Sequence, residues 1–536
     1  MVRLIIKISP MKNIYKLLLI LFITSTAKAQ TYIPTWSDDI ACIFYSRCTS
    51  CHNANGIAPF SLIDYNDAVA YATGIQTAVN SKYMPPWPPD VSYQTLAHER
   101  ILTPQEITLI NDWINNGTQQ GNIANAPAPP VYSSAAQITA PDISLVMPNY
   151  VVPPLSSDMY RCFVMPTNVS VDKYLAAIEI LPGNRNIVHH VLVYQDVANT
   201  ALTLGSLDPD PGYTSFGGPG SNSAELVGGW VPGSEPYFLP AGMGIKLKAN
   251  SKIILQIHYP LGSTGQTDST RVNFLYSTSP SVRNVRVDPL LYHNAPVLQN
   301  GPLFIPANTI QTFHEMFTIP AIVGNVTLLT VGPHMHLIGT QAESYAVSTL
   351  LDTIPLIRIN NWDFHWQGFY SFRKPVKIPA GSTLHAYATY DNTGGNPNNP
   401  NNPPQNVGLG ENTTDEMMLT YFYWLPYVTG DENIAVDTVT VPLTYNGCTY
   451  TTGINDHVVN SNFRVYPNPA TDFAVIDLPG EHYYQVAIQN AMGQEVKIYN
   501  NIKSSLKIDC SKLNKGIYFL KVSSEKNSFY QKLEVI

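Results

Sequence analysis

The chain has 536 residues, and its 30 Lys and Arg against 38 Asp and Glu give it a net charge of −8. This balance argues against nucleic acid as a partner, because phosphate backbones are bound by basic surfaces. Only 13% of the residues are charged, whereas 43 are proline, 33 glycine and 32 tyrosine. This composition is typical of β-rich exported proteins rather than helical cytosolic enzymes. At about 150 residues per domain, the length excludes a single small domain and predicts roughly three or four.

A signal peptide is expected at the N-terminus. Lys12 and Lys16 precede the apolar run 17–23, and the small-residue cleavage site Ala27-Lys28-Ala29 follows it. We therefore expect residues 1–29 to be removed during export. Since no later stretch reaches the ~18 apolar residues of a membrane-spanning helix, no transmembrane span is predicted in the mature chain.

The next motif predicts a covalently bound haem. Cys48-Thr49-Ser50-Cys51-His52 is a C-x-x-C-H sequence, in which both thiols bond to haem vinyl groups and the histidine ligates the iron. A redox C-x-x-C or half of a zinc site is the alternative. Neither a thioredoxin-like βαβ pattern nor a second Cys/His pair at short range supports that alternative. Because the motif occurs once, a dihaem peroxidase is excluded.

The sixth ligand of the haem iron is expected on a proline-rich loop. Met84 begins the sequence MPPWPPD, and a thioether opposite the histidine favours reduced iron and raises the potential. His98 is the competing ligand, and a simple packing role for Met84 is the third possibility.

A helix and a resemblance complete the predicted haem domain, residues 31–122. Thr103 as N-cap and Glu106 as its capping-box partner predict an amphipathic helix that stops at 115–117. The segment 48–121 also resembles the small cytochrome c domains fused to exported oxidoreductases, which implies a small all-α fold. A linker rich in Ala and Pro is expected to follow at 123–142.

From residue 143 to 448, short β-branched and aromatic runs broken by Gly, Pro and Asn predict β-sandwiches rather than βαβ units. Within this region, His334 and His336 stand at positions i and i+2, so on a strand both project from one face while Met335 points away. Such a pair is half of a metal site, and an ordinary pair of strand histidines is the alternative. A third ligand is available in Met417, whose soft thioether beside two imidazoles selects copper over zinc or magnesium.

A second histidine cluster is predicted from three residues. His189 and His190 end the apolar strand predicted at 187–188, and on a regular strand they point to opposite faces. One metal ion can bind both only where a bulge or turn redirects one of them. His258 ends another apolar strand, at 253–257, and would complete an all-imidazole site with open positions. Ordinary surface or core roles are predicted for His98, His293, His314, His365, His385, His457 and His482.

The order of these motifs resembles the type II copper, ascorbate-dependent monooxygenase family, which includes the peptidylglycine and dopamine hydroxylating enzymes. The resemblance spans roughly residues 142–448 and rests on the four ligand motifs in the family's order. Three intervening sequences add to it, namely Gly229-Trp230-Val231-Pro232-Gly233, Leu239-Pro240-Ala241-Gly242 and Trp362-Asp363-Phe364-His365-Trp366-Gln367.

The resemblance implies two β-sandwich subdomains of jelly-roll type, at 143–290 and 291–448, that each hold one copper ion across an open cleft. It implies that one copper ion transfers electrons and is bound by His189, His190 and His258. It also implies that the other copper ion binds O2, attacks a C–H bond and is bound by His334, His336 and Met417. Each copper ion would supply one of the two electrons that a hydroxylation consumes.

Two departures from the family limit this expectation. In the peptide-amidating branch, an arginine two residues before the H-x-H pair and an asparagine two residues after the methionine help to grip the substrate carboxylate. Gly332 and Leu419 occupy these positions here, which argues against a peptide with a C-terminal glycine as substrate. The eukaryotic members are also rich in disulfides, whereas this domain has only Cys162 and Cys448, whose pairing would link its two ends.

The last part of the chain, residues 462–536, is expected to form a separate small β-sandwich, since apolar and polar residues alternate in it. The sequences at 463–470, 516–522 and 532–536 resemble the C-terminal sorting domain of the type IX secretion system. This resemblance implies export through the periplasm to the cell surface or the medium by that machinery. A carbohydrate-binding or interaction module is the alternative.

Together these features predict a multidomain, mainly β protein with two copper ions and one haem c. The predicted function is an exported monooxygenase that takes O2, a small-molecule substrate, and electrons from an ascorbate-like reductant, a redox protein or its own haem. A one-electron carrier tethered by a short linker stays at a high effective concentration. A surface copper-binding and electron-transfer relay that oxygenates nothing is the alternative.

Overall fold

The computed structural model describes residues 32–54, 56–132, 136–138, 140–436, 464–478, 483–490, 495–523 and 528–536. The expected signal peptide lies outside these residues. The chain divides into two units, Met1–Cys448 and Thr449–Ile536, and each is described by itself. Among the described residues, no helix is both long enough and apolar enough to cross a membrane.

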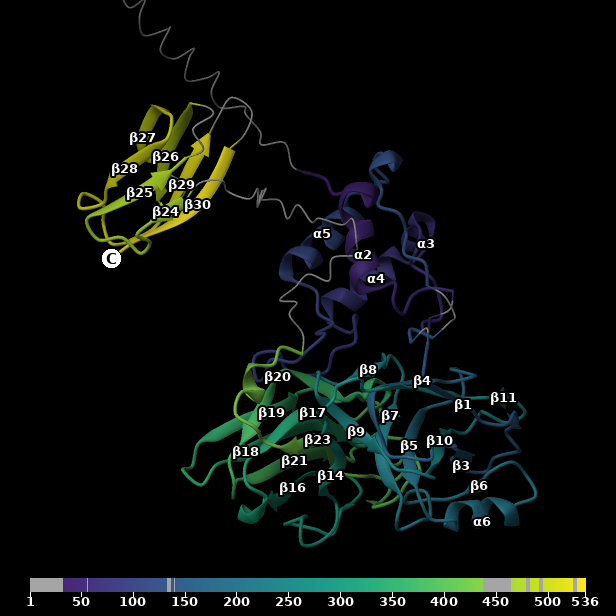
Figure 1. Cartoon of the computed structure of the whole chain (residues 1–536). Coiled ribbons are helices and arrows are strands. Elements are labelled where there is room, and N and C mark those ends of the chain that lie inside the picture. Colours follow the sequence, from purple (N-terminus) through teal and green to yellow (C-terminus); the bar gives the residue numbers. More distant parts are fainter. Residues whose placement is uncertain are drawn as a thin grey trace, which may run out of the picture. The chain divides into compact units, whose positions relative to one another are not determined.

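The N-terminal part of the first unit is built from short helices (Figure 1). They are η2 (Trp36–Ile40), α2 (Ala41–Arg47), α3 (Tyr65–Ala70), α4 (Ala72–Asn80), α5 (Pro104–Asn115) and η3 (Ile123–Asn125). The prediction for α5 is confirmed, because Thr103 caps it and forms a capping box with Glu106. Trp36, Phe44 and Trp113 join η2, α2 and α5, with ring centroids 5.5 to 6.3 Å apart.

Two β-sheets packed face to face form the first sandwich. One sheet has the strand order β1-β12-β4-β9-β13 with β8 paired to β4, the other has the order β6-β3-β10-β5-β7, and β2 pairs with β11. The strands are β1 (Ile143–Val146), β2 (Tyr150–Val151), β3 (Met159–Pro166), β4 (Lys173–Leu181), β5 (His190–Asp196), β6 (Tyr213–Thr214), β7 (Glu225–Trp230), β8 (Tyr237–Phe238), β9 (Met243–Leu247), β10 (Lys252–Tyr259), β11 (Thr267–Asp268), β12 (Arg271–Tyr276) and β13 (Arg283–Asn284).

The helix α6 (Thr200–Leu207) covers the outer face of the second of these sheets. Ala201 on this helix packs with Cys162 on β3 and Ile254 on β10, and all three are buried. Cys162 is a free thiol, so the predicted disulfide with Cys448, a residue that lies outside the described ranges, is wrong. The spacing of cysteines could not reveal that Cys162 is unpaired, because the helix α6 that buries Cys162 lies about forty residues away in the chain.

The second sandwich is also formed by two antiparallel sheets. Their strand orders are β14-β23-β17-β20 and β16-β21-β18-β19, and β15 pairs with β22. The strands are β14 (Arg286–Tyr292), β15 (Phe304–Ile305), β16 (Ile310–Thr318), β17 (Val326–His334), β18 (Gly339–Val347), β19 (Thr353–Ile359), β20 (Tyr370–Ile378), β21 (Thr383–Asp391), β22 (Val407–Gly408) and β23 (Leu419–Pro426). Three short 3-10 helices accompany them, η4 (Ala321–Val323), η5 (Phe364–Trp366) and η6 (Asp431–Asn433).

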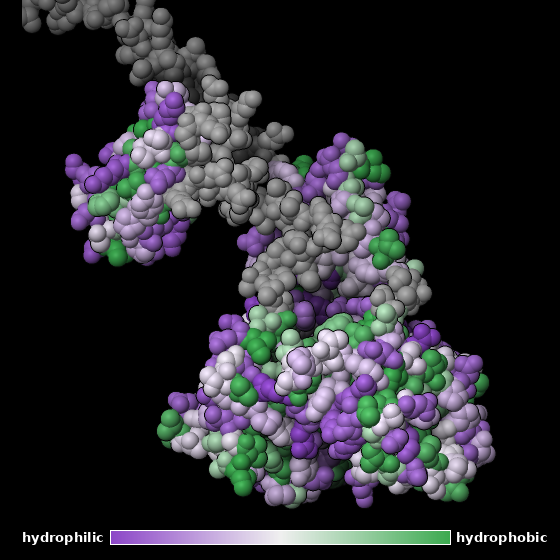
Figure 2. All heavy atoms as spheres, in the orientation of Figure 1, coloured by the Kyte–Doolittle hydropathy of each residue, from purple (hydrophilic) through white to green (hydrophobic). Residues whose placement is uncertain are grey.

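The two sandwiches share part of one core. Leu329 on β17, with Tyr423 and Leu425 on β23, belongs to the second sandwich, yet these buried side chains pack with the core of the first. This shared core fixes the ends of β5, β10 and β17 relative to one another, and the candidate ligands lie at those ends. The space-filling view shows hydrophilic and hydrophobic residues mixed over the visible face of both sandwiches (Figure 2).

The segment between α4 and α5 runs along the second sandwich, and we call its residues Trp87–Ala97 the strap. Backbone bridges join Pro89 to β19 and Leu96 to β20. The N–H groups of Asp90 and Ala97 donate to carbonyl groups of the same two strands, at 2.7 Å in each case. Leu96 is only 1% exposed and is part of the sandwich core. The proline-rich sequence predicted to be a haem loop therefore attaches the helical part to the second sandwich.

The second unit has a three-stranded sheet, β24-β25-β28, and a four-stranded sheet, β27-β26-β29-β30. A core of apolar side chains from both sheets, including Ile476, Ile488 and Leu520, lies between them. The strands are β24 (Arg464–Tyr466), β25 (Phe473–Asp477), β26 (Tyr484–Asn490), β27 (Glu495–Ile502), β28 (Ser505–Asp509), β29 (Gly516–Ser523) and β30 (Ser528–Val535). The alternation of apolar and polar residues therefore indicated the correct fold, a small β-sandwich.

Candidate metal centre

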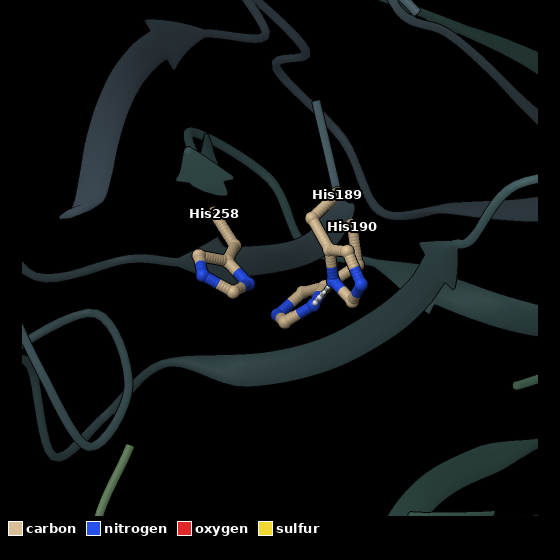
Figure 3. Close-up of side chains that lie close together, drawn as sticks. All are labelled: His189, His190 and His258. Carbon is tan, nitrogen blue, oxygen red and sulfur yellow. Dashed lines mark hydrogen bonds between the residues drawn. The ribbon is translucent and has the colours of Figure 1, made fainter. Parts of the chain in front are cut away.

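Three imidazoles converge in the first sandwich. His190 on β5 lies directly opposite His258 on β10, and the backbone N–H of His189 donates to the carbonyl of His258 at 3.0 Å. One ring nitrogen from each of the three residues lies within 4.8 Å of the other two. Figure 3 shows the three rings turned toward one another. This is the arrangement that a single metal ion requires of three ligands.

The local backbone explains how two consecutive histidines reach one site. The apolar strand expected at Ile187-Val188 is wrong, because residues 185–187 form a turn and β5 begins only at His190. His189 therefore precedes the strand. The alternation of side chains along a strand, which would point His189 to the opposite face from His190, does not apply to it. This turn directs His189 toward the same site as His190, as binding of one metal ion by both residues requires.

The H-x-H pair lies at the end of β17. The strand ends at His334, His336 follows two residues later, and the two ring centroids are 5.1 Å apart. Between them, Met335 is buried in the core of the second sandwich. The Nδ1 atom of His334 contacts Oε1 of Gln367, and Nδ1 of His336 lies 3.0 Å from the carbonyl of Asp415. Both contacts leave Nε2 as the atom that can bind a metal.

Met417 and both histidine sets meet at one cavity of about 390 Å³, which we call the metal cavity. Met417, His190 and His334 all line it. Aromatic side chains form much of the remaining wall, namely Tyr160, Tyr194, Trp230, Tyr292, Phe369 and Tyr421. A ligand in this cavity would therefore meet candidate ligand residues from both sandwiches.

The two histidine sets are close neighbours, and the open cleft expected between them is a wrong prediction. The rings of His190 and His334 have centroids 6.3 Å apart. Phe364 stacks on His189 at 4.5 Å and meets His336 edge-on at 5.7 Å, so it fills the space between the sets. The hydroxyl of Tyr160 on β3 also donates across the boundary of the sandwiches to the carbonyl of Glu411, at 2.8 Å.

Burial keeps these imidazoles uncharged. It lowers the pKa of His189 and His334 to about 3 and that of His336 to about 4, and neighbouring imidazoles add to each effect. Burial holds the pKa of His190 well below its usual value, and the four other imidazoles of the two sets lower it further. Neutral imidazole is the form that binds metals, so the rings are ready for a metal at neutral pH.

Unpartnered nitrogen atoms support a metal ion at the three-histidine cluster. Among the described residues, Nε2 of His189 and both ring nitrogens of His258 are buried and make no hydrogen bond. Asp158 lies 3.4 Å from Nε2 of His258. Buried polar atoms without partners are rare in folded proteins, and a bound cation would satisfy them. Imidazole together with the thioether of Met417 fits copper best.

Three polar residues to which the sequence assigned no role position these ligands. Glu416 is fully buried and accepts the N–H groups of His336 and Ile338, each at 2.8 Å, while burial raises its pKa to about 8. Gln367 orients His334, as described above. Asp158 accepts the N–H of Thr413 at 2.8 Å and so links the first sandwich to the segment before Met417. Although burial opposes it, contact with His258 and hydrogen bonds from Thr413 hold the pKa of Asp158 well below its usual value.

The predicted haem ligands lie elsewhere, in the helical part. Cys48 and Cys51 are free, half-buried thiols directly after α2. His52 is buried, and its Nδ1 lies 3.1 Å from the carbonyl of Phe60, which leaves Nε2 as its ligand atom. Met84 is half-buried just beyond α4, and His98 is exposed. None of these five residues lines the metal cavity.

Two families match parts of the chain. Residues 308–439 match the C-terminal domain of the copper type II ascorbate-dependent monooxygenases, and this range contains His334, His336 and Met417. Residues 464–536 match a secretion system C-terminal sorting domain. The tyramine beta-hydroxylase of Caenorhabditis briggsae is 22% identical over 310 residues, which are 53% of this chain and 49% of that protein. The chain thus spans about half the length of this relative.

Likenesses to solved structures are weak. PorZ, a surface component of the type-IX secretion system of Porphyromonas gingivalis, is 21% identical over 16% of this chain and 13% of its own, with a TM-score of 0.13. A β-glucuronidase of Faecalibacterium prausnitzii is 12% identical over 42% of this chain and 37% of its own, with a TM-score of 0.12. At these scores neither likeness carries an argument about function. The chain therefore carries the C-terminal domain of a copper-dependent monooxygenase, an oxidoreductase class, together with a sorting domain for export to the cell surface or the medium.

Proposed function

We propose that this protein is an exported copper-dependent monooxygenase that hydroxylates a C–H bond with O2. The observation that carries the proposal is the meeting of two candidate ligand sets at one cavity, with the rings of His190 and His334 only 6.3 Å apart. His189, His190 and His258 would hold one copper ion, and His334, His336 and Met417 the other. Bound copper would activate O2 and supply one electron from each ion.

The surrounding residues support this assignment of ligands. Gln367 and the carbonyl of Asp415 occupy the Nδ1 atoms of the H-x-H pair, so both rings present Nε2. Glu416 holds the backbone at His336 and just after it, and the adjoining residue is Met417. Phe364 packs between the two ligand sets, against His189 and His336, and so excludes water from that part of the site.

The cavity wall supports a small aromatic amine as substrate. Six aromatic side chains line the cavity and can stack on an aromatic ring, and Glu411 supplies a carboxylate for a cationic amine. Tyramine, the substrate in the name of the Caenorhabditis briggsae relative, has both groups and is the first compound to test. Gly332 stands where the peptide-amidating branch carries an arginine for a substrate carboxylate, and a Cβ at this position would lie 2.8 Å from the ring of Phe369. A peptide carboxylate therefore lacks that partner here.

We further propose that the C-x-x-C-H segment carries a haem that passes electrons to the copper sites. Cys48 and Cys51 are free thiols, and the contact of His52 Nδ1 with the carbonyl of Phe60 leaves Nε2 available, which fits such a group. Met84 lies three residues before the strap, whose first residue, Trp87, meets the ring of Tyr370 in the second sandwich at 5.4 Å. Tyr370 is three residues from Gln367, the partner of His334.

Replacing Cys48 and Cys51 together by alanine tests this electron supply. We expect the variant to lose haem absorbance, keep its copper and turn over at least about 10-fold more slowly with an electron-donor protein, because the tethered carrier is gone. Haem absorbance, copper content and steady-state O2 uptake are the measurements. Cys162→Ala, which removes a free thiol far from the motif in the chain, should leave all three unchanged. Turnover unaltered with every reductant tried would refute the role of the haem.

A further inference from the structure

A second cavity, also of about 390 Å³, lies between the helical part and the two sandwiches, and we call it the interdomain cavity. Arg47 at the end of α2 lines it from the helical part, and Trp87 and Arg100 line it from the strap and the residues after it. Much of the remaining wall comes from residues 229–237 of the first sandwich and residues 367–371 of the second. Its volume is in the range of cavities that bind small molecules, ~300–1,000 Å³.

Two buried donors in this wall have no acceptor. The side chain of Arg47 is only 2% exposed, and its Nε donates to Glu106 at 3.1 Å. Its Nη2 and the Nε1 of Trp87 are both buried and make no hydrogen bond within the described chain. An unsatisfied buried donor is costly, and more so for a charged group. Two residues of the cavity wall thus each carry an N–H group that lacks the acceptor its burial calls for.

The charge of the wall favours an anion as that acceptor. The guanidinium of Arg100 lies 6.0 Å from the centre of the Trp87 ring, and its Nη1 donates to the carbonyl of Gly233 at 3.1 Å. A planar guanidinium beside further donors suits a carboxylate or a similar anion. Glu235 is the acidic residue in the wall, and it is exposed.

The interdomain cavity adjoins the metal cavity. Gln367, Gly368 and Phe369 line both of them. Because Gln367 also contacts Nδ1 of His334, this one residue links the wall of the interdomain cavity to the H-x-H pair. On the other side, Arg47 directly precedes Cys48.

We propose that the interdomain cavity is a binding site for a small organic anion, a carboxylate or enediolate, held by Arg47, Trp87 and Arg100. Such an anion has two sources. It is either a free reductant of the ascorbate class or a propionate group of a haem attached at Cys48 and Cys51. Only the use of the anion as an electron donor or carrier rests on the proposed function, since the binding site itself stands on the geometry of the wall.

The test measures binding to the full-length, copper-free chain by titration calorimetry without O2. The probe is L-ascorbate, and the neutral L-gulono-1,4-lactone of similar size is its control. Trp87→Phe keeps the ring and removes only the N–H, and Arg100→Gln removes one charge. We expect each substitution to weaken ascorbate binding at least about 10-fold, with no binding of the lactone. Arg358→Gln, at a guanidinium that pairs with Glu343 outside the cavity, should change nothing.

Comparing haem-bearing with haem-free protein separates the two sources. Binding to both forms identifies a free anion site, and binding to the haem-free form alone identifies a site that a haem propionate fills. Equal binding of ascorbate and lactone, indifference to both substitutions, or no binding to either form would overturn the proposal. Because no copper is present in either form, these results are independent of whether the copper-loaded protein consumes O2.

Discussion

Replacing Met417 by alanine is expected to lower the rate of hydroxylation at least about 100-fold while the three-histidine site keeps its copper. The change removes the thioether from a set that otherwise consists of His334 and His336, whereas His189, His190 and His258 are untouched. Loss of a residue that merely supports a metal ligand already costs roughly 10- to 100-fold. A two-imidazole site also loses the preference for Cu(I) that a soft ligand provides.

Copper content and reductant-dependent O2 uptake, measured side by side, check this prediction. Met335→Leu is the matched control, because Met335 lies between the two histidines but points into the core and the swap nearly conserves volume. The control should keep both activity and copper. A Met417→Ala protein with the uptake rate of its parent would show that Met417 is no ligand of the reacting centre.

Replacing Glu315 by methionine is expected to stabilise the first unit, and more strongly at pH 8 than at pH 5. Glu315 on β16 is fully buried, and neither carboxylate oxygen has a hydrogen-bond partner within the described chain. Burial raises its pKa from 4.5 to about 9. Because the folded pKa lies above the unfolded one, the folded protein holds a proton that the unfolded chain releases, and stability falls as pH rises from 4.5 to 9.

The size of this effect follows from the two pKa values. At ~1.36 kcal/mol per pKa unit, the cost of Glu315 is about 4 kcal/mol larger at pH 8 than at pH 5. This difference is measured by urea unfolding of the metal-free variant and its parent at both pH values. Contributions of the other titrating groups cancel when the variant is compared with its parent. Glu343→Met, at a half-exposed glutamate paired with Arg358, should show a difference well below about 1 kcal/mol. A stabilisation by Glu315→Met that is equal at both pH values would contradict the account.

Features that depend on local sequence could be predicted. The helix α5 follows from a capping box and a proline, and the alternating burial of β21 follows from its residue pattern. The pairing of His334 with His336 needs only a spacing of two residues at a strand end. The order of the ligand motifs then pointed to copper chemistry, although no single motif identifies it.

Features that depend on contacts between distant segments could not be predicted. The turn before His190 is set by how β5 starts beside β10, and the sequence of the two histidines does not reveal it. The closeness of the two ligand sets depends on Tyr160 and Asp158 meeting residues more than 250 positions later. The strap packs against β19 and β20, also more than 250 residues away, so its prolines indicated only a stiff loop.

Reductant-dependent O2 uptake by the purified, copper-loaded chain, measured with tyramine and related aromatic amines, tests the central claim most directly. The account predicts two bound copper ions per chain and a product that carries one oxygen atom from ¹⁸O2. Two bound copper ions without any uptake of O2 would contradict it and would leave an electron-transfer relay as the function of these sites.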